Sequence, residues 1–269
     1  MPVVRSLIII NVVAYFLLMV GSESAGSLPL EILALHNWLS PEFKPWQLIT
    51  HMFLHDMGGI FHLFFNMLAL WMFGTALEQT WGPKRFVIYY FVCGLGAALL
   101  HNTIVAIQLQ PMIEDADAYL SQPSYAAFDS FVSSYLPGSF DNAQINEYLL
   151  QWYKDQPNPG YITQSQQLVK EIVDLRINTP TVGASGAIYG LLLAFGMTFP
   201  NAMIMMLIPP IPMKAKYFVL VYGIIELSMG VRNNLEDNVA HFAHLGGMLF
   251  GILLILYFRK QDKNKYRYL

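Results

Sequence analysis

Long apolar stretches recur along this 269-residue chain, and they constrain its fold more than any other feature of the sequence. A bilayer has a hydrocarbon core about 30 Å thick, so a helix needs roughly 20 apolar residues to cross it. Charged residues make up only 12% of the chain, whereas a soluble domain carries about 25%. The sequence therefore predicts an all-α membrane protein with six transmembrane helices, at residues 7–20, 59–77, 86–107, 184–199, 217–229 and 239–258.

The first apolar stretch, residues 7–20, follows Arg5 and is short enough to resemble a cleaved signal peptide, which stays an alternative. A retained helix is preferred because residues 22–27 offer only a weak cleavage pattern. Lys and Arg collect at the cytoplasmic ends of membrane helices, and six spans return the basic residues 259–267 to the side of the N-terminus. We expect an integral protein of a bacterial inner membrane with both termini in the cytoplasm.

A polar segment at about residues 108–180 separates the third and fourth stretches. It carries nine acids and three bases, so lipid cannot surround it. Helical patterns occur at residues 141–156 and 165–178. We expect a small extracytoplasmic helical subdomain, inserted between helices 3 and 4 of one membrane domain that covers residues 1–269. A tolerated loop without a role is the alternative.

The run TVGASGAIYG, residues 181–190, places one serine, Ser185, among small residues that include Gly183. Serines in membrane helices usually bond a carbonyl group one turn earlier. Ser185 differs because it begins a helix, where free N–H groups favour developing negative charge. Ala187 occupies the last glycine position of a G-x-S-x-G elbow, which disfavours an α/β-hydrolase. The pattern predicts that Ser185 is a nucleophile held in the membrane.

Two histidines, His241 and His244, open the sixth apolar stretch. Histidine in a membrane span is costly and indicates function. Gly246 and Gly247 follow His244 and give its helix a smooth face, which can pack on the glycines around Ser185. We expect His244 within hydrogen-bonding reach of Ser185 Oγ, as a general base requires. His241 ranks second, and two structural histidines are the alternative.

The second apolar stretch supplies His62 and Asn66, four residues apart and hence on one helix face. Both side chains can donate hydrogen bonds to a developing oxyanion. A metal site is the alternative, but it leaves Ser185 unexplained and the chain has no H-E-x-x-H run. We therefore expect no metal and no cofactor. The histidines that a metal site would use are His51, His55, His62, His241 and His244.

Four motifs in this order resemble the rhomboid family of intramembrane serine proteases: HLFFN from His62 to Asn66, G-x-x-x-E-x-x-x-G around Glu78, GASG around Ser185, and AHLGG around His244. The resemblance covers the six stretches and not residues 108–180. It implies a six-helix rhomboid-like bundle whose catalytic pair, Ser185 and His244, has no third acid.

The same resemblance implies roles for other residues. Tyr189 would stack on the imidazole, and His62, Asn66 and the Ser185 N–H would form the oxyanion hole. Glu78 would be a buried structural acid. The chain departs from the family in having Trp46-Gln47 where many members have Trp-Arg, and in its long segment at residues 108–180.

The implied function is a serine endopeptidase that cleaves transmembrane segments of membrane proteins near the extracytoplasmic face. The expected partners are these substrates and the lipid bilayer. A catalytically silent rhomboid-like chaperone or binding protein is the alternative. A transporter is disfavoured because we find no internal repeats, and dispersed Lys and Arg with a net charge of −3 exclude a nucleic-acid partner.

Overall fold

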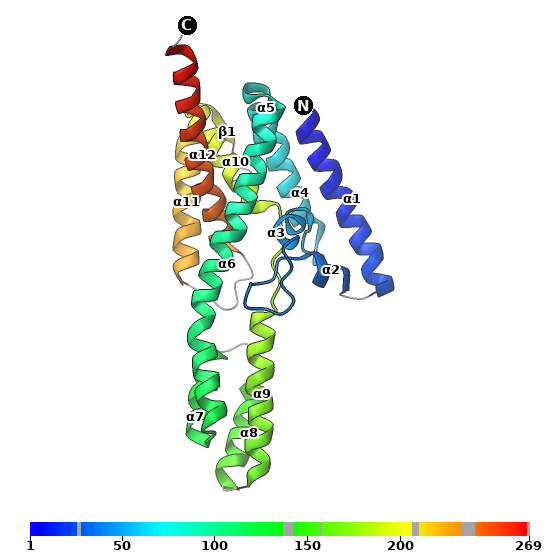
Figure 1. Cartoon of the computed structure of the whole chain (residues 1–269), viewed down its shortest axis with the longest axis vertical. Helices are drawn as coiled ribbons and strands as arrows, with labels where there is room; N and C mark the ends of the chain where they lie inside the picture. Colours follow the sequence, from blue (N-terminus) through cyan, green and yellow to red (C-terminus); the bar gives the residue numbers. More distant parts are fainter. Residues whose placement is uncertain (26–27, 137–141, 156–157, 206–209, 233–239, 268–269) are drawn as a thin grey trace. The chain divides into compact units, whose positions relative to one another are not determined.

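The computed structural model describes residues 1–25, 28–136, 142–155, 158–205, 210–232 and 240–267, and these are mainly helical (Figure 1). The chain divides into two compact units. We call residues 1–36, 42–103 and 180–269 the membrane unit. Residues 37–41 and 104–179 form the aromatic unit.

The membrane unit is built around helices that correspond to the six apolar stretches. Three shorter helices lie between the first two stretches, and a two-stranded antiparallel sheet follows α10. The long elements are α1 (Pro2–Ala25), α4 (Ile60–Ala69) continued by η2 (Leu70–Gly74) and α5 (Thr75–Trp81), α6 (Pro83–Ser121), α10 (Ser185–Thr198), α11 (Ala215–Arg232) and α12 (His241–Arg267). The short ones are α2 (Leu28–Leu33), α3 (Gln47–Thr50), η1 (His51–Phe53), β1 (Met203–Met205) and β2 (Pro212–Lys214).

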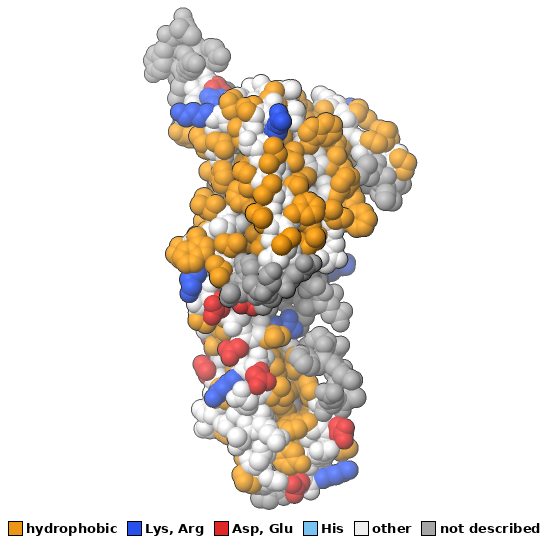
Figure 2. Space-filling view, turned by 90° about the vertical axis from the view of Figure 1, so that its right-hand side faces the viewer, with side chains coloured by type: hydrophobic (Ala, Val, Ile, Leu, Met, Phe, Trp, Pro, Cys, Tyr) orange, Lys and Arg blue, Asp and Glu red, His pale blue; other side chains and the backbone are white. Residues whose placement is uncertain are grey.

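Four helical segments in the described part of the chain are long and apolar enough to cross a membrane: Pro2–Gly21, Ile60–Trp81, Pro83–Ser121 and His241–Asp262. Hydrophobic side chains cover the face of the membrane unit shown in Figure 2. The chain is thus a helical integral membrane protein. Helix α10 has only 14 residues, and α11 carries Glu226 among its apolar residues, so the count of six spans stays a prediction.

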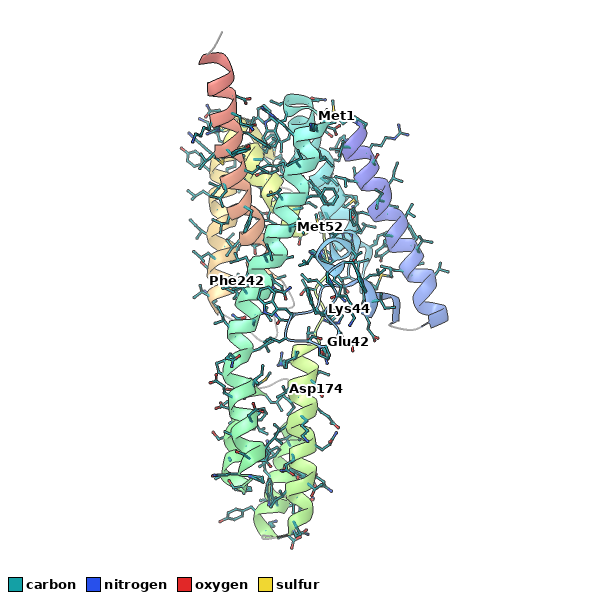
Figure 3. All side chains as sticks on the ribbon, in the orientation of Figure 1. Met1, Glu42, Lys44, Met52, Asp174 and Phe242 are labelled. Carbon is teal, nitrogen blue, oxygen red and sulfur yellow. The ribbon has the colours of Figure 1, made fainter. Side chains whose placement is uncertain are left out.

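Glycines bring α10 and α12 into close contact. A Cβ atom at Gly247 would overlap the carbonyl oxygen of Gly186, and one at Gly190 would lie 3.0 Å from the carbonyl oxygen of Gly247. The hydroxyl of Tyr89 in α6 donates a hydrogen bond of 2.9 Å to the carbonyl oxygen of Gly190. Gly247 therefore packs on α10 as expected, whereas Gly246 faces Gly96 and Ala97 of α6. Met52 (Figure 3) is buried and packs against Gly94 of α6.

The carboxylate of Glu78 caps the first helix. It is 2% exposed and accepts hydrogen bonds from the backbone N–H groups of Val3, at 3.1 Å, and Val4, at 2.9 Å. The first N–H groups of a helix have no partner within the helix, and negative charge is favourable at that end. Glu78 thereby joins the end of the second apolar stretch to the start of α1.

The aromatic unit has its own apolar core. It contains the end of α6 with α7 (Tyr125–Tyr135), α8 (Asn142–Lys154) and α9 (Pro159–Ile177). Phe128 is fully buried and Trp152 is 3% exposed, and the Trp152 and Tyr161 rings stack with their centroids 6.0 Å apart. These side chains bury large apolar areas, which favours folding in water.

Two features of this unit differ from the expectation. The apolar stretch at residues 86–107 does not end a helix, because α6 continues to Ser121. Buried Leu109, Met112, Ala116 and Tyr119 keep the helical spacing of apolar residues in that continuation. The helix predicted at residues 165–178 begins earlier, at Pro159. Asn158 is its N-cap and accepts a hydrogen bond from the Gly160 N–H.

Candidate active site

Ser185 is the first residue of α10 and lies against α12. The backbone N–H of Ile188 bonds to the carbonyl oxygen of Ala184 at 3.1 Å, which closes the first turn of the helix. Ser185 Oγ is 2.8 Å from His244 Nε2, within hydrogen-bonding distance. The structure therefore brings together the serine and the histidine that the sequence singles out, across the glycine contact between their helices.

Tyr189 fixes the plane of the His244 ring. The two rings stack with centroids 4.0 Å apart and planes within 8° of each other. Tyr189 lies one turn after Ser185 on α10, so the same helix presents the hydroxyl group and the stacking ring. This is the position that the family resemblance implies for Tyr189.

The resemblance implies a catalytic pair without an acidic third member, but the structure places the carboxylate of Glu226 beside His244. It lies in α11 and is 5% exposed. Its Oε2 atom is 2.6 Å from His241 Nδ1 and 2.9 Å from His244 Nδ1, and its Oε1 accepts a hydrogen bond from the Tyr189 hydroxyl. The contact with His241 has hydrogen-bond geometry. The contact with His244 does not meet the angle of a hydrogen bond, so we describe it as an electrostatic contact at hydrogen-bonding distance.

Sequence reasoning missed Glu226 although a signal was present. The residue interrupts the apolar stretch at residues 217–229. Ionisable groups in membrane helices are costly, and this argument applies to a carboxylate as much as to the histidines. An acid in the middle of a span should therefore have been included among the site residues.

His62 and Gly183 border the space beside the Ser185 hydroxyl. A Cβ atom at Gly183 would lie 3.4 Å from Ser185 Oγ and 3.7 Å from His62 Nε2. Gly183 has φ +132°, a conformation that side chains strain, and its N–H bonds to the His51 carbonyl oxygen. The Asp56 N–H donates to His62 Nδ1 at 3.4 Å, which leaves the proton of a neutral ring on Nε2, facing this space.

Asn66 lies one turn after His62 on α4 and is 7% exposed. Its Nδ2 donates a hydrogen bond of 2.8 Å to the His62 carbonyl oxygen. An amide group has two donor hydrogens, so one remains for another acceptor. The structure thus places Asn66 on the helix face of His62 but bonded to its own helix.

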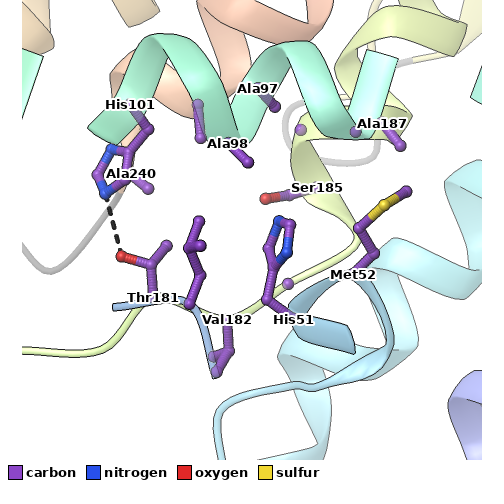
Figure 4. A pocket seen from close by; sticks show the side chains of 15 residues that line it. His51, Met52, Ala97, Ala98, His101, Thr181, Val182, Ser185, Ala187 and Ala240 are labelled. Carbon is purple, nitrogen blue, oxygen red and sulfur yellow. Dashed lines mark hydrogen bonds between the residues drawn. The ribbon is translucent and has the colours of Figure 1, made fainter. Parts of the chain in front are cut away.

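A cavity beside Ser185 has polar groups in its wall (Figure 4). His51 Nδ1 is 2.7 Å from the Gln47 carbonyl oxygen, and His101 Nε2 is 3.0 Å from Thr181 Oγ1. Burial lowers the pKa of His51 to about 4, so its ring is neutral at neutral pH. The rest of the wall is mainly small residues, which include Gly94, Ala97, Ala98, Gly186, Ala187 and Ala243.

The five histidines of the metal alternative do not form one set. In the described part of the chain, the metal-ligand atoms that converge belong to Glu226, His241 and His244, within 4.8 Å of one another. The hydrogen bond between His241 and Glu226 already uses two of these groups. His55 instead contacts His62, with ring centroids 5.3 Å apart.

Known protein families include one that this chain matches. A model described as "Rhomboid domain" matches residues 42–109 and 160–261, which is more than half of the chain. The chain belongs to the rhomboid family. The residues between the two matched ranges lie in the aromatic unit.

Several curated rhomboid proteins are similar to this one. Rhomboid protease GluP of Bacillus subtilis is 36% identical over 93 residues, which are 34% of this chain and 18% of GluP. Rhomboid protease AarA of Providencia stuartii is 27% identical over 165 residues, 60% of this chain and 56% of AarA. Inactive RHOMBOID-like protein 8 of Arabidopsis thaliana is 31% identical over 81 residues, 30% of this chain and 22% of that protein. The chain thus matches less than two thirds of the length of each.

Proposed function

We propose that this rhomboid protein is an intramembrane serine endopeptidase that cleaves transmembrane segments of membrane proteins. The observation that carries the proposal is the distance of 2.8 Å between Ser185 Oγ and His244 Nε2. A nucleophile and a base within hydrogen-bonding reach, with the base oriented by further groups, are the signature of covalent catalysis. Tyr189 and Glu226 contact the base here.

The reaction follows from the positions of these groups. Ser185 Oγ attacks the carbonyl carbon of the scissile peptide bond while His244 Nε2 takes its proton. The carbonyl oxygen becomes an oxyanion, for which the Ser185 N–H, His62 and Asn66 are the proposed donors. His244 then gives the proton to the leaving amine, and water hydrolyses the acyl-enzyme.

Water and substrate must reach Ser185 from a polar environment. Ser185 begins an apolar helix of only 14 residues, and the adjacent cavity carries His51, His101 and Thr181 in its wall. Non-helical backbone and polar groups at membrane depth are tolerated where they line a water-filled space. We infer that a substrate helix unwinds near the extracytoplasmic face, with both termini of this protein in the cytoplasm of a bacterium.

A catalytically silent rhomboid protein is the second candidate, since one relative is named inactive. The contact between Ser185 and His244 favours the active enzyme. The test is labelling of the purified protein by a fluorescent serine-directed phosphonate. Ser185→Ala and His244→Ala should lose labelling, whereas Ser228→Ala, which changes an exposed serine of α11, should keep it. Labelling that survives in Ser185→Ala contradicts the proposal.

The same preparation tests the metal alternative. Incubation with EDTA should leave phosphonate labelling and substrate cleavage unchanged, because the proposed chemistry uses only side chains. Cleavage that stops with EDTA and persists in Ser185→Ala would instead support a metal-dependent enzyme.

A further inference from the structure

We propose that Glu226 is a positioning residue for this reaction, holding His244 in the tautomer that can accept the proton of Ser185. The inference rests on the proposed function. It concerns a group on α11, a helix that contributes neither the nucleophile nor the base.

The two nitrogens of His244 face different partners. Nε2 lies 2.8 Å from Ser185 Oγ, and buried Nδ1 lies 2.9 Å from Glu226 Oε2. In a neutral imidazole one nitrogen carries the proton and the other accepts one. A carboxylate oxygen can only accept, so the proton is favoured on Nδ1 and Nε2 is left free to accept from Ser185.

The Glu226 carboxylate is itself held on both oxygens. Tyr189 donates its hydroxyl proton to Oε1, and His241 Nδ1 lies 2.6 Å from Oε2. Tyr189 also stacks on the His244 ring, so one side chain fixes both the acid and the base. The network joins α10, α11 and α12 and restrains the direction in which His244 points.

The proton balance is simple. When Ser185 Oγ bonds to the carbonyl carbon, its O–H bond breaks and an N–H bond forms at His244 Nε2. His244 then carries protons on both nitrogens and a positive charge, next to the negative Glu226. The carboxylate stabilises the protonated His244 ring and stays ionised. The proton on Nε2 then leaves with the amine.

A merely structural acid must be distinguished from a positioning residue, and the chain offers a matched control. Glu78 is also a buried carboxylate, but it accepts from the N–H groups of Val3 and Val4. Glu226→Gln and Glu78→Gln make the same chemical change at two sites. Both should lower the thermal unfolding temperature in detergent.

The expected difference lies in the rate per folded molecule. An amide at position 226 can donate to Nδ1 and stabilise the wrong tautomer, a change that lowers kcat about 10⁴-fold in soluble serine proteases. We expect Glu226→Gln to lower kcat for a transmembrane peptide, and the phosphonate labelling rate, on the order of 10²-fold or more. KM should stay within about twofold, because the substrate is not contacted. Glu78→Gln should keep the wild-type kcat.

Two further variants keep the test decisive if Glu226→Gln does not fold. Tyr189→Phe retains the stacked ring and removes the donor to Glu226, so kcat should fall less, about tenfold. Glu226→Asp keeps the charge and should recover part of the lost rate.

An unchanged kcat in folded Glu226→Gln, or an equal fall in Glu78→Gln, overturns the positioning role. If Glu226→Gln does not fold, an unchanged kcat in Tyr189→Phe overturns it. The proposed function fails separately, if the wild type does not label or Ser185→Ala does.

Discussion

The two units of this protein differ in how their helices meet, although both bury aromatic rings, such as Tyr89 in the membrane unit and Phe128 in the aromatic unit. In the membrane unit, α10 and α12 meet through Gly186, Gly190 and Gly247, with backbone against backbone. The aromatic unit encloses large rings such as Phe128 and Trp152. Lipid chains are as apolar as a buried leucine, so helices in a bilayer associate through close fit rather than through the hydrophobic effect. In water, the hydrophobic effect instead stabilises a fold in proportion to the apolar area that it buries.

The difference matters for the proposed chemistry. Close backbone contact leaves little freedom between the helices that carry Ser185 and His244, and this fixes the distance of 2.8 Å between their reacting atoms. A core of large side chains is stabilised by buried apolar area, so it should respond most to loss of volume. Four predictions, from the largest expected effect to the smallest, test whether the two kinds of packing respond differently.

The largest effect on labelling is expected for Gly247→Ala. The new methyl group would overlap the carbonyl oxygen of Gly186 and push α10 away from α12. A misplacement of about 1 Å can cost on the order of 10²-fold in rate, so phosphonate labelling should fall by at least that factor. Gly59→Ala is the control, because nothing lies within 4 Å of a Cβ atom there. Equal labelling of both variants would show that the close contact is not required.

The aromatic unit should respond to loss of volume instead. Phe128 is fully buried, so Phe128→Ala should destabilise this unit by about 3–5 kcal/mol. Hydrogen exchange at residues 104–179 should speed up, while labelling of Ser185 stays within about twofold of the wild type. Tyr153→Ala, at a residue 66% exposed, is the control and should change neither. A large fall in labelling in Phe128→Ala would show that the units depend on each other.

Acid should destabilise the membrane unit through buried histidines. Burial lowers the pKa of His51 and of His55 from 6.5 to about 4. Between these values the unfolded chain binds more protons than the folded one, so stability is full above pH 6.5 and falls as the pH drops toward 4. The loss should be on the order of 2–3 kcal/mol for each histidine. Thermal unfolding followed from pH 7 to 4 measures it, and His51→Gln should flatten the curve.

The smallest effect is expected at the surface of the aromatic unit. The Tyr135 hydroxyl donates a hydrogen bond of 2.6 Å to the Asp115 carboxylate. Tyr135→Phe should cost only about 0.5–1 kcal/mol, since water replaces a partner at an accessible site. The matched Tyr153→Phe should cost less. A loss as large as that of Phe128→Ala would mean that polar contacts stabilise this unit as much as its core.

The sequence predicts those site residues that can be recognised from their neighbours in the chain. Glycines cluster around Ser185, and a histidine stands beside Gly246 in an apolar stretch. Small residues are enriched where membrane helices pack closely, so these two segments are predicted to meet. The contact of Glu226 is not local, because its partners lie on α10 and α12. A sequence can show that burying an acid is costly. It cannot show which histidine lies close enough to offset the cost of burying that charge.

Some helices were predicted from the sequence and others were not. The apolar stretches coincide with helices of the structure, and α8 and α9 lie where helical patterns occur. Helix α7 (Tyr125–Tyr135) was not predicted, because Ser and Asp interrupt its apolar residues. The continuation of α6 to Ser121 was not predicted because the sequence changes from apolar to polar near residue 108, although the helix does not stop there.

The cap that Glu78 places on α1 has a consequence for biosynthesis. The donors at Val3 and Val4 precede their acceptor by 75 and 74 residues. The carboxylate is thus synthesised after the helix that it caps, and α1 on its own lacks this partner for its first N–H groups. We expect the start of α1 to reach its final state only when the second apolar stretch is in place.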